Sequence, residues 1–429
     1  IIFIICMFLH SPVLSQVVCQ KKRRGIREFS YLCIIQDLVP EQQMFLAIPI
    51  FILMAATMAA DWYHFHRFRR RRPIPAGRIV WAVVTDLLPL AAILIGTLSR
   101  DNTTAVVQAS MWLLWAWLFT VLPRLARYPF RLIGWRRAGN IAAALIAVTL
   151  LWGATLGRTS LRVSRVEICS ERLPAAFDGM RLVQISDLHL GTIVSPEREL
   201  GRLADRINAL RPDLVLFTGD LVNIRAAELD ERMARLLQRI EAPVYSVTGN
   251  HDVGTYIKDS LHHTIADNLR SLIDRQEAMG WHVLDNRTCY IRRGGDSISL
   301  TGLSFDPALR WLRHNRHLPA TGMDKAYGGV PRETFNITLA HVPQLWEQIT
   351  AAGYGDLTLS GHVHAMQLKI RFSGRGWSPA SWLYEHWSGR YDNDDGRTLY
   401  INDGTGYVGY PMRLGARPEI TLLTLKQCE

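Results

Sequence analysis

Aspartate, asparagine and histidine residues follow directly after five short apolar runs in the second half of the chain. In chain order they are Asp187, His189, Asp220, Asn250, His251, Asp252, His341, His362 and His364. Carboxylate oxygens and imidazole nitrogens together form the donor set of divalent ions such as Mn, Fe and Zn. Two such ions ~3.5–4 Å apart, bridged by a carboxylate, can hold a hydroxide and polarise a phosphoryl group. The residue types therefore predict a two-metal site suited to phosphoryl chemistry.

The elements that would position these residues are short strands alternating with helices. The apolar runs cover residues 181–185, 214–217, 244–247, 336–339 and 357–359. A helical pattern over 196–210, opened by Ser195 and Pro196, separates the first two runs, and another over 227–240 precedes the third. This alternation predicts an α/β fold, in which functional groups gather at the carboxyl ends of strands. Asp187 and His189 stand two apart, so an extended segment would point both side chains the same way.

Each motif alone has an ordinary explanation. The segment 187–189 could be an unspecialised loop, and 361–364 could form one metal site or none. The segment 249–252 could be a plain turn, because Gly, Asn and Asp tolerate left-handed backbone. The five motifs in order are far more specific than any one of them. The non-enzymatic alternative, a scaffold on the same fold, would lack some metal ligands, and no predicted ligand is missing from this sequence.

The order Asp-x-His, Gly-Asp, Gly-Asn-His-Asp, His and Gly-His-x-His resembles the calcineurin-like metallophosphoesterase family, over about residues 180–425. The separations are 33 residues from Asp187 to Asp220 and 30 from Asp220 to Asn250, which leaves room for one helix and one strand each. The resemblance implies an αββα sandwich, with two mixed sheets flanked by helices. It also implies two divalent metal ions, with Mn favoured over Fe, Zn or Mg.

The resemblance also implies a role for each residue. Asp187, His189 and His364 would hold the first metal, and Asp220 would bridge both ions. The second metal would bind Asn250, His341 and His362. The catalytic pair would be His251, which donates a proton or hydrogen bond to the leaving oxygen, and Asp252, which orients its ring. A hydroxide between the two metals would attack phosphorus without a protein nucleophile.

The tail of the chain resembles a bacterial, membrane-linked branch of the family, which contains transmembrane metallophosphoesterases and UDP-2,3-diacylglucosamine pyrophosphatases. The likeness rests on the segments 403–406, 411–413 and 417–420. Arg413 would contact a substrate phosphate or pair with an acid inside the protein. Where the branch has Gly-Gly-Gln after the last metal-binding histidine, this chain has Ala365, Met366 and Gln367. The bulkier pair affects the expected substrate more than the expected metals.

Long apolar runs separated by arginine-rich loops dominate the first 157 residues. We expect about four membrane spans, near residues 44–60, 79–99, 105–122 and 141–157. A buried soluble helical domain is the alternative, but its helices would normally show a polar stripe. The expected organisation is an unassigned segment 1–43 that could hold a fifth span, a transmembrane region 44–157, a linker with a first strand 158–179, and the metallophosphoesterase domain 180–429.

The charge distribution predicts how the chain sits in its membrane. The net charge is +11, with six arginines in the loop 61–78, five in 123–140 and one in 100–104. By the positive-inside rule the two rich loops are cytoplasmic, which puts the catalytic domain outside the inner membrane of a bacterium. The segment Lys21–Arg24 argues the other way. We expect no nucleic-acid partner, and the six scattered cysteines predict no disulfide framework.

The expected partners are the bilayer and a phosphorylated, lipid-linked substrate such as UDP-2,3-diacylglucosamine. The segment 377–391 is rich in Trp and Tyr, which suits a membrane interface or a lipid groove, with core packing as the alternative. If the domain lies outside, a phospholipid phosphodiesterase or a general phosphomonoesterase fits better. A transporter or sensor would need polar residues along the spans, and only Asp86 qualifies; a polar contact within the bundle is its simpler role.

Overall fold

The computed structural model describes residues 41–69, 74–258, 264–307, 322–372 and 375–428. The chain divides into two units, Ile1–Tyr63 and His64–Glu429. Helix α4 (Glu41–Arg69) contains the predicted span 44–60, which stays a prediction. The segment 1–40 lies outside the described residues.

Within the described ranges, three helical segments are long and apolar enough to cross a membrane: Ala76–Leu98, Thr104–Leu132 and Arg136–Thr159. They match the predicted spans 79–99, 105–122 and 141–157, except that the first ends one residue earlier, at Leu98. The first is broken at Leu87 into α5 (Ala76–Asp86) and α6 (Leu88–Leu98), because Pro89 lacks the N–H that would continue the helix. The other two contain α7 (Thr104–Leu132) and α8 (Arg136–Thr155). Asp86 forms an ion pair with Arg124 of α7, so the simpler of its two predicted roles is observed.

Two six-stranded sheets build the rest of the chain, as the αββα prediction requires. The first, in spatial order, consists of β1 (Arg162–Ser170), β14 (Glu419–Gln427), β2 (Arg181–Ile185), β3 (Leu214–Phe217), β4 (Val244–Ser246) and β5 (His282–Val283). The second consists of β12 (Gly389–Asp392), β13 (Thr398–Ile401), β9 (Leu357–Ser360), β8 (Asn336–Ala340), β7 (Asp296–Leu303) and β6 (Arg287–Arg293). A separate hairpin pairs β10 (Ile370–Phe372) with β11 (Arg375–Trp377).

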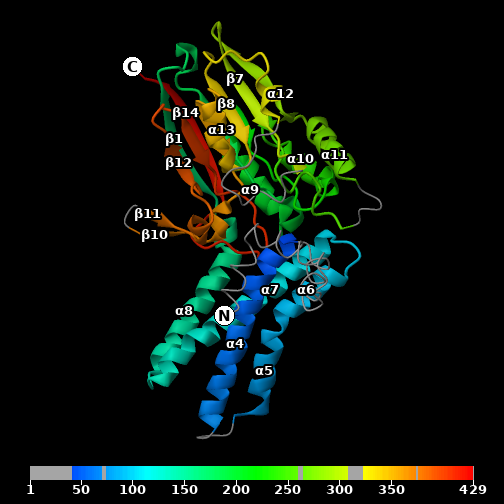
Figure 1. The fold of residues 1–429 in the computed structure, drawn as a ribbon, viewed down its shortest axis with the longest axis vertical. Helices are drawn as coiled ribbons and strands as arrows, with labels where there is room; N and C mark the ends of the chain where they lie inside the picture. The colour runs from blue at the N-terminus through cyan, green and yellow to red at the C-terminus, as the bar shows by residue number, and fades with distance from the viewer. Residues whose placement is uncertain (1–40, 70–73, 259–263, 308–321, 373–374, 429) are drawn as a thin grey trace, which may run out of the picture. The chain divides into compact units, whose positions relative to one another are not determined.

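Helices complete the layers (Figure 1). They are α9 (Pro196–Asn208), α10 (Glu231–Leu237), α11 (Ile265–Ala278), α12 (Met323–Tyr327) and α13 (Trp346–Ala351). Short 3₁₀ turns lie at η2 (Gly157–Thr159), η3 (Ala175–Phe177), η4 (Leu190–Thr192), η5 (Ala226–Glu228), η7 (Pro343–Leu345), η8 (His364–Gln367) and η9 (Pro379–Trp382). The helix predicted over 227–240 is the turn η5 followed by the shorter α10.

Alternation along β2 shows how the core is divided. Leu182 packs between the two sheets with Leu216 and Leu359, whereas Val183 packs against Leu203 of α9. Successive strand residues point to opposite faces, so a single strand contributes to both apolar layers. The apolar runs predicted from the sequence are continuous for this reason.

The strand β1 comes from the predicted linker 158–179 and pairs in parallel with β14, at the other end of the chain. Figure 1 shows β14, in red, beside β1. The pairing brings Cys169 and Cys428 within a Cα–Cα distance of 5.6 Å, and the two form a disulfide. The cysteines were expected to form no disulfide framework, and this single bond was not predicted. No local pattern indicates the pair, because 259 residues separate the two cysteines.

Candidate metal centre

The predicted ligands lie on loops at the carboxyl ends of two sets of parallel strands. In the first sheet β2, β3 and β4 are adjacent and parallel, and in the second sheet β8 and β9 are. Backbone hydrogen bonds tie neighbouring loops together: Asp187 N–H donates to Gly219 O at 2.9 Å, and Gly361 N–H to His341 O at 3.0 Å. The five loops therefore meet at one place between the sheets, as predicted.

The backbone of these loops differs from the prediction. Five ligands have a positive φ: Asp187 (55°), His189 (48°), Asp220 (58°), His362 (71°) and His364 (52°). The segments 187–189 and 362–364 are therefore left-handed at the ligands and not extended. Such a conformation costs a non-glycine residue about 1–3 kcal/mol and persists only where the surroundings enforce it.

Ala365 and Met366 continue the same strained conformation, each with a φ of 46°. Glycine adopts this region without a Cβ penalty. The Gly-Gly pair expected from the family branch would therefore suit this backbone better than the pair present. The departure noted in the sequence raises the strain beside His364 and leaves the ligand loop in place.

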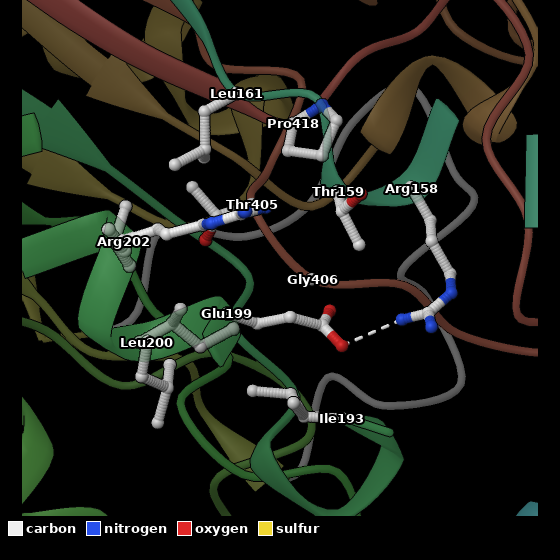
Figure 2. A pocket seen from close by; sticks show the side chains of 12 residues that line it. Arg158, Thr159, Leu161, Ile193, Glu199, Leu200, Arg202, Thr405, Gly406 and Pro418 are labelled. Carbon is white, nitrogen blue, oxygen red and sulfur yellow. Dashed lines mark hydrogen bonds and ion pairs between the residues drawn. The ribbon is translucent and has the colours of Figure 1, made fainter. Parts of the chain in front are cut away.

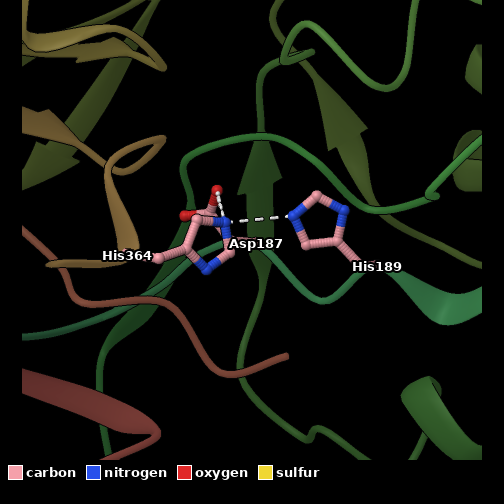
Figure 3. Close-up of side chains that lie close together, drawn as sticks. All are labelled: Asp187, His189 and His364. Carbon is pink, nitrogen blue, oxygen red and sulfur yellow. Dashed lines mark hydrogen bonds and ion pairs between the residues drawn. The ribbon is translucent and has the colours of Figure 1, made fainter. Parts of the chain in front are cut away.

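Asp187, His189 and His364 form the first cluster (Figure 3). The Nε2 atom of His364 lies 3.0 Å from Oδ1 of Asp187 and 3.1 Å from Nε2 of His189. In Figure 3 the two rings and the carboxylate point toward one another. All three residues are buried, and His189 and Asp187 have no exposed surface.

Asp220, Asn250, His341 and His362 form the second cluster. The Nε2 atom of His341 lies 3.2 Å from Oδ2 of Asp220 and 3.1 Å from Oδ1 of Asn250. Nδ1 of His362 lies 2.8 Å from the same Asn250 oxygen. Asp220 joins the clusters, because its Oδ2 is also 3.7 Å from Nε2 of His189. The seven predicted ligands are thus brought together, with Asp220 in the shared position.

His251 and Asp252 stand at the rim and beneath the site. The His251 ring is partly exposed, and its Nδ1 lies 2.7 Å from the carbonyl oxygen of Asn223. Asp252 is buried, and its carboxylate accepts the backbone N–H groups of Asp220, Gly249 and Val222. Asp252 was predicted to orient the His251 ring, and the Asn223 carbonyl has that position in the structure. Asp252 instead holds the backbone of the loop that carries Asp220.

Electrostatics within the cluster favour ionised carboxylates. Burial by itself raises the pKa of Asp187 and Asp220, but the imidazoles around them, led by His364 and His341 respectively, outweigh it and hold both pKa values below the ordinary range. Burial lowers the pKa of His341, yet the Asp220 carboxylate raises it to about 9. Buried carboxylates facing imidazoles are a donor set that fits divalent ions. Three groups of residues have their donor atoms within 4.8 Å of one another: Asp187, His189 and His364; His189, Asp220 and His251; and Asp220, His341 and His362.

Arg413 lies behind the first cluster. It is buried, and its guanidinium donates to the carbonyl oxygens of Gly406, Asp403 and Ala416. Its Nη2 lies 3.2 Å from Nδ1 of His364, and burial lowers its pKa to about 10. Of the two roles predicted for Arg413, these contacts favour pairing inside the protein. The partners are backbone carbonyls and not the acid that was expected. A contact to substrate phosphate stays a prediction.

Two tyrosines near the ligands were not predicted. The Tyr256 hydroxyl accepts a hydrogen bond from Nδ2 of Asn250 at 2.9 Å, which turns the Asn250 oxygen toward the histidines. Its ring also stacks on His251, with centroids 4.4 Å apart. The Tyr384 hydroxyl lies 3.4 Å from Nε2 of His362. Tyr256 follows the Gly-Asn-His-Asp motif by a few residues, which was the only available signal.

Two glycines allow the ligand loops to approach closely. A Cβ added at Gly249 would overlap the Asp220 carboxylate, and one at Gly361 would overlap Ser186 and the Asp187 carboxylate. Both glycines belong to the sequence motifs. They are needed because the shared ligand and the first ligand pass directly against their backbones.

A separate pocket lies behind Leu188, the residue between two ligands (Figure 2). The ion pair between Arg158 and Glu199, at 2.7 Å, spans it, and α9 supplies apolar side chains. Its lining includes none of the seven predicted ligands. The pocket is therefore separate from the candidate centre.

Comparisons with known proteins agree with the geometry. A model of the calcineurin-like phosphoesterase family matches residues 180–366. A transmembrane protein with a metallophosphoesterase domain from Danio rerio is 33% identical over 297 residues, covering 67% of this chain and 62% of that protein. The corresponding Bos taurus protein is 32% identical, covering 62% and 57%. The chain thus spans about three fifths of the length of these two relatives.

A bacterial relative is aligned over most of its own length. The UDP-2,3-diacylglucosamine pyrophosphatase LpxG of Chlamydia trachomatis is 27% identical over 327 residues, covering 64% of this chain and 92% of that protein. The matched family region contains the seven predicted ligands, which the structure brings together. The chain therefore carries a calcineurin-like metallophosphoesterase domain, preceded by apolar helices long enough to span a membrane.

Proposed function

We propose that this protein is a membrane-anchored, two-metal phosphohydrolase that cleaves a phosphoester or pyrophosphate bond of a lipid-linked substrate. The observation that carries the lipid part is an exposed apolar patch beside the metal centre. It consists of Ile370, Trp377, Trp382 and Leu383, with exposed fractions of 52%, 39%, 74% and 52%. Tyr384 follows directly and contacts the ligand His362, so the patch adjoins the site.

The seven ligands would hold two divalent ions in the arrangement predicted from the sequence. Asp187, His189 and His364 would bind one ion. Asn250, His341 and His362 would bind the other, and Asp220 would contact both. The mixed oxygen and imidazole donors suit Mn, Fe or Zn, and we favour manganese on the family resemblance. When bound, such ions supply an activated water and neutralise charge developing on the phosphoryl oxygens.

The protein's own groups have two tasks in this reaction. His251 is partly exposed at the rim, so its ring can reach a leaving oxygen and donate a proton to it. The Asn223 carbonyl and the stacked Tyr256 ring hold His251 in one orientation. The ring is therefore already aligned to donate its proton to the leaving oxygen. No side chain is required as the nucleophile.

The patch supports a bilayer substrate because large apolar groups exposed together mark a binding surface. Trp377 and Trp382 contact each other, with ring centroids 5.5 Å apart, and Trp rings are well suited to the lipid interface. The alternative prediction, that the segment 377–391 is core, describes Tyr384 but not these tryptophans. A lipid anchored in the membrane could thus present its phosphate beside His362.

Two observations favour a second candidate, a phospholipid phosphodiesterase or a phosphomonoesterase outside the cytoplasm. The arginine-poor loop contacts the catalytic domain, where Asn102 Nδ2 donates to Tyr256 O at 2.7 Å. The positive-inside rule then puts that domain outside, opposite the arginine-rich loops. The Cys169–Cys428 disulfide agrees, since disulfides persist in oxidising compartments. A UDP-2,3-diacylglucosamine substrate, suggested by the LpxG relative, requires the cytoplasmic side.

The lipid proposal is tested by comparing two substrates on one set of variants. In full-length protein in vesicles, the variant carrying Trp377→Ser and Trp382→Ser should lose about tenfold more kcat/KM on a vesicle phospholipid or UDP-diacylglucosamine than on soluble bis-p-nitrophenyl phosphate. Tyr290→Ser, an exposed aromatic on β6, is the matched control and should change both rates equally. Equal losses on both substrates in the tryptophan variant would refute the lipid surface. Hydrolysis of UDP-diacylglucosamine would favour the pyrophosphatase, and hydrolysis of the vesicle phospholipid would favour the phosphodiesterase outside the cytoplasm.

A further inference from the structure

A basic cavity lies within the membrane helices, far along the chain from the metal ligands. Its volume is about 400 Å³, and its lining includes Arg78, Trp81, Arg124, Arg127, Tyr128 and Arg131. Arg78 and Trp81 stand in the first two turns of α5, and the other four residues stand in the last turns of α7. Nothing in the predicted reaction uses this group of residues.

The charges lining the cavity are unbalanced. Asp86 is ion-paired with Arg124, whose Nη1 also donates to Thr85 Oγ1 at 2.8 Å. Arg78, Arg127 and Arg131 have no carboxylate ion pair among the described residues. The Nε atom of Arg127 is buried and has no hydrogen-bond partner in the described part of the chain. The wall of the cavity therefore carries an excess of positive charge and an unused donor.

Such an arrangement is unfavourable unless an anion enters. Like charges close together in a region of low dielectric repel strongly. A buried guanidinium nitrogen without a partner also loses its hydration without compensation. Arg forks match the geometry of phosphate oxygens, and clustered Arg residues are a common phosphate site. The cavity thus has the charge, donors and volume for a phosphate group.

The surroundings indicate that this phosphate belongs to a lipid. The helices beside the cavity expose large apolar side chains, including Val80, Val84, Leu132 and Ile133. These would face acyl chains, while Trp81 and Tyr128 have the amphipathic character found at the headgroup level. Basic pockets between membrane helices on the cytoplasmic side are suited to anionic headgroups.

We infer that this cavity binds the phosphate of an anionic phospholipid. The site lies at the opposite ends of α5–α6 and α7 from the loop 99–103, which contacts the catalytic domain. It is therefore a second phosphate site, separate from the metal centre. The inference does not depend on the proposed function, because it uses none of the residues assigned to hydrolysis.

The test measures lipid-dependent thermal stability of the full-length protein in a neutral detergent. Wild type is compared with a pocket variant carrying Arg127→Gln and Arg131→Gln. The matched control carries Arg136→Gln and Arg137→Gln, which replaces two exposed arginines that do not line the cavity. The probes are dioleoylphosphatidylglycerol, dioleoylphosphatidylcholine and inorganic phosphate. Gel filtration and the melting temperature without additive establish that each variant is folded.

Phosphatidylglycerol should raise the melting temperature of wild type and control by roughly 3–8 °C more than phosphatidylcholine does. The pocket variant should lose most of that difference. An equal response of the pocket variant, or an equal effect of phosphatidylcholine on wild type, would overturn the site. Any phosphate bound at the metal centre acts on all three proteins and cancels in the comparison. A variant-dependent shift with inorganic phosphate alone would support the phosphate site and assign it to a soluble anion.

Discussion

The membrane helices and the catalytic domain place their polar and apolar groups in opposite ways. In the helices, large apolar side chains are exposed: Val80 by 60%, Leu98 by 77% and Leu145 by 63%. At the metal centre, Asp187 and His189 are ionisable and have no exposed surface. The first pattern is stable only against lipid, and the second only with compensating charges. The exposed apolar side chains therefore favour a lipid environment for the helices, and the buried ionisable groups favour bound cations at the candidate centre.

The two regions meet at residues close to the metal ligands. Arg225 forms an ion pair with Asp101, and Gln108 of α7 donates to the carbonyl of Gly191, directly after the ligand loop. Asn102 donates to the backbone of Tyr256, whose hydroxyl contacts Asn250. The membrane helices therefore support the loops of the site as well as anchoring it.

Removal of the shared ligand should lower activity more than any other change. Asp220→Ala should lower kcat/KM for bis-p-nitrophenyl phosphate with Mn by about 1000-fold or more, since both ions lose a ligand. Asp296→Ala, an exposed carboxylate on β7, is the control and should stay within about twofold of wild type. If Asp220→Ala turned over like the control, the buried carboxylates would have no catalytic role.

A smaller effect is expected where the protein alone acts. His251→Ala should reduce kcat by about 100-fold or more, because it removes a proton donor in the transition state. Its metal content, measured by plasma mass spectrometry, should stay at the wild-type level. A variant that loses its metals together with its activity would make His251 a ligand and contradict the assigned role.

Tyr256→Phe tests whether the support beneath the ligands matters. It removes the hydroxyl that accepts from Asn250 but keeps the ring on His251. We expect about tenfold weaker binding of Mn, measured by competition with a chelator. Tyr290→Phe, an exposed tyrosine on β6, should bind Mn like wild type. Equal affinity in both variants would show that Asn250 is oriented without Tyr256.

The smallest expected effect concerns the junction between the two regions. Arg225→Ala breaks a partly exposed ion pair with Asp101, so it should cost at most about 1 kcal/mol and lower the melting temperature by about 1–3 °C. Arg232→Ala, which breaks a more exposed pair with Glu197, should cost less. A larger drop for Arg232→Ala would mean that the junction adds nothing to stability.

The sequence predicted the parts of the centre that depend on local order. Apolar runs ending in Asp, Asn or His identify strands and the loops after them. The order of the motifs along the chain then gave the family resemblance, which implied the two sheets and the seven candidate ligands. The strand pairs β2–β3 and β3–β4 also follow from βαβ connections. Membrane spans are similarly local, because their signal is an uninterrupted apolar run.

Features set by distant contacts were out of reach. The pairing of β1 with β14 and the disulfide at its end join opposite ends of the domain, and no local pattern encodes them. The left-handed backbone at Asp187 and His364 is imposed by the crowded loops around them, so propensity argued for extended segments. The His251 ring contacts the backbone carbonyl of Asn223, and sequence motifs do not reveal such a contact.

If the buried carboxylates and imidazoles form a centre for two divalent ions, the purified full-length protein should retain those ions. Plasma mass spectrometry measures this metal content. After equilibration with Mn and removal of free ions, wild type should retain about two ions per chain, and Asp220→Ala less than one. Wild type with less than one ion per chain, or with the same content as the variant, would show that these residues do not form a two-metal centre.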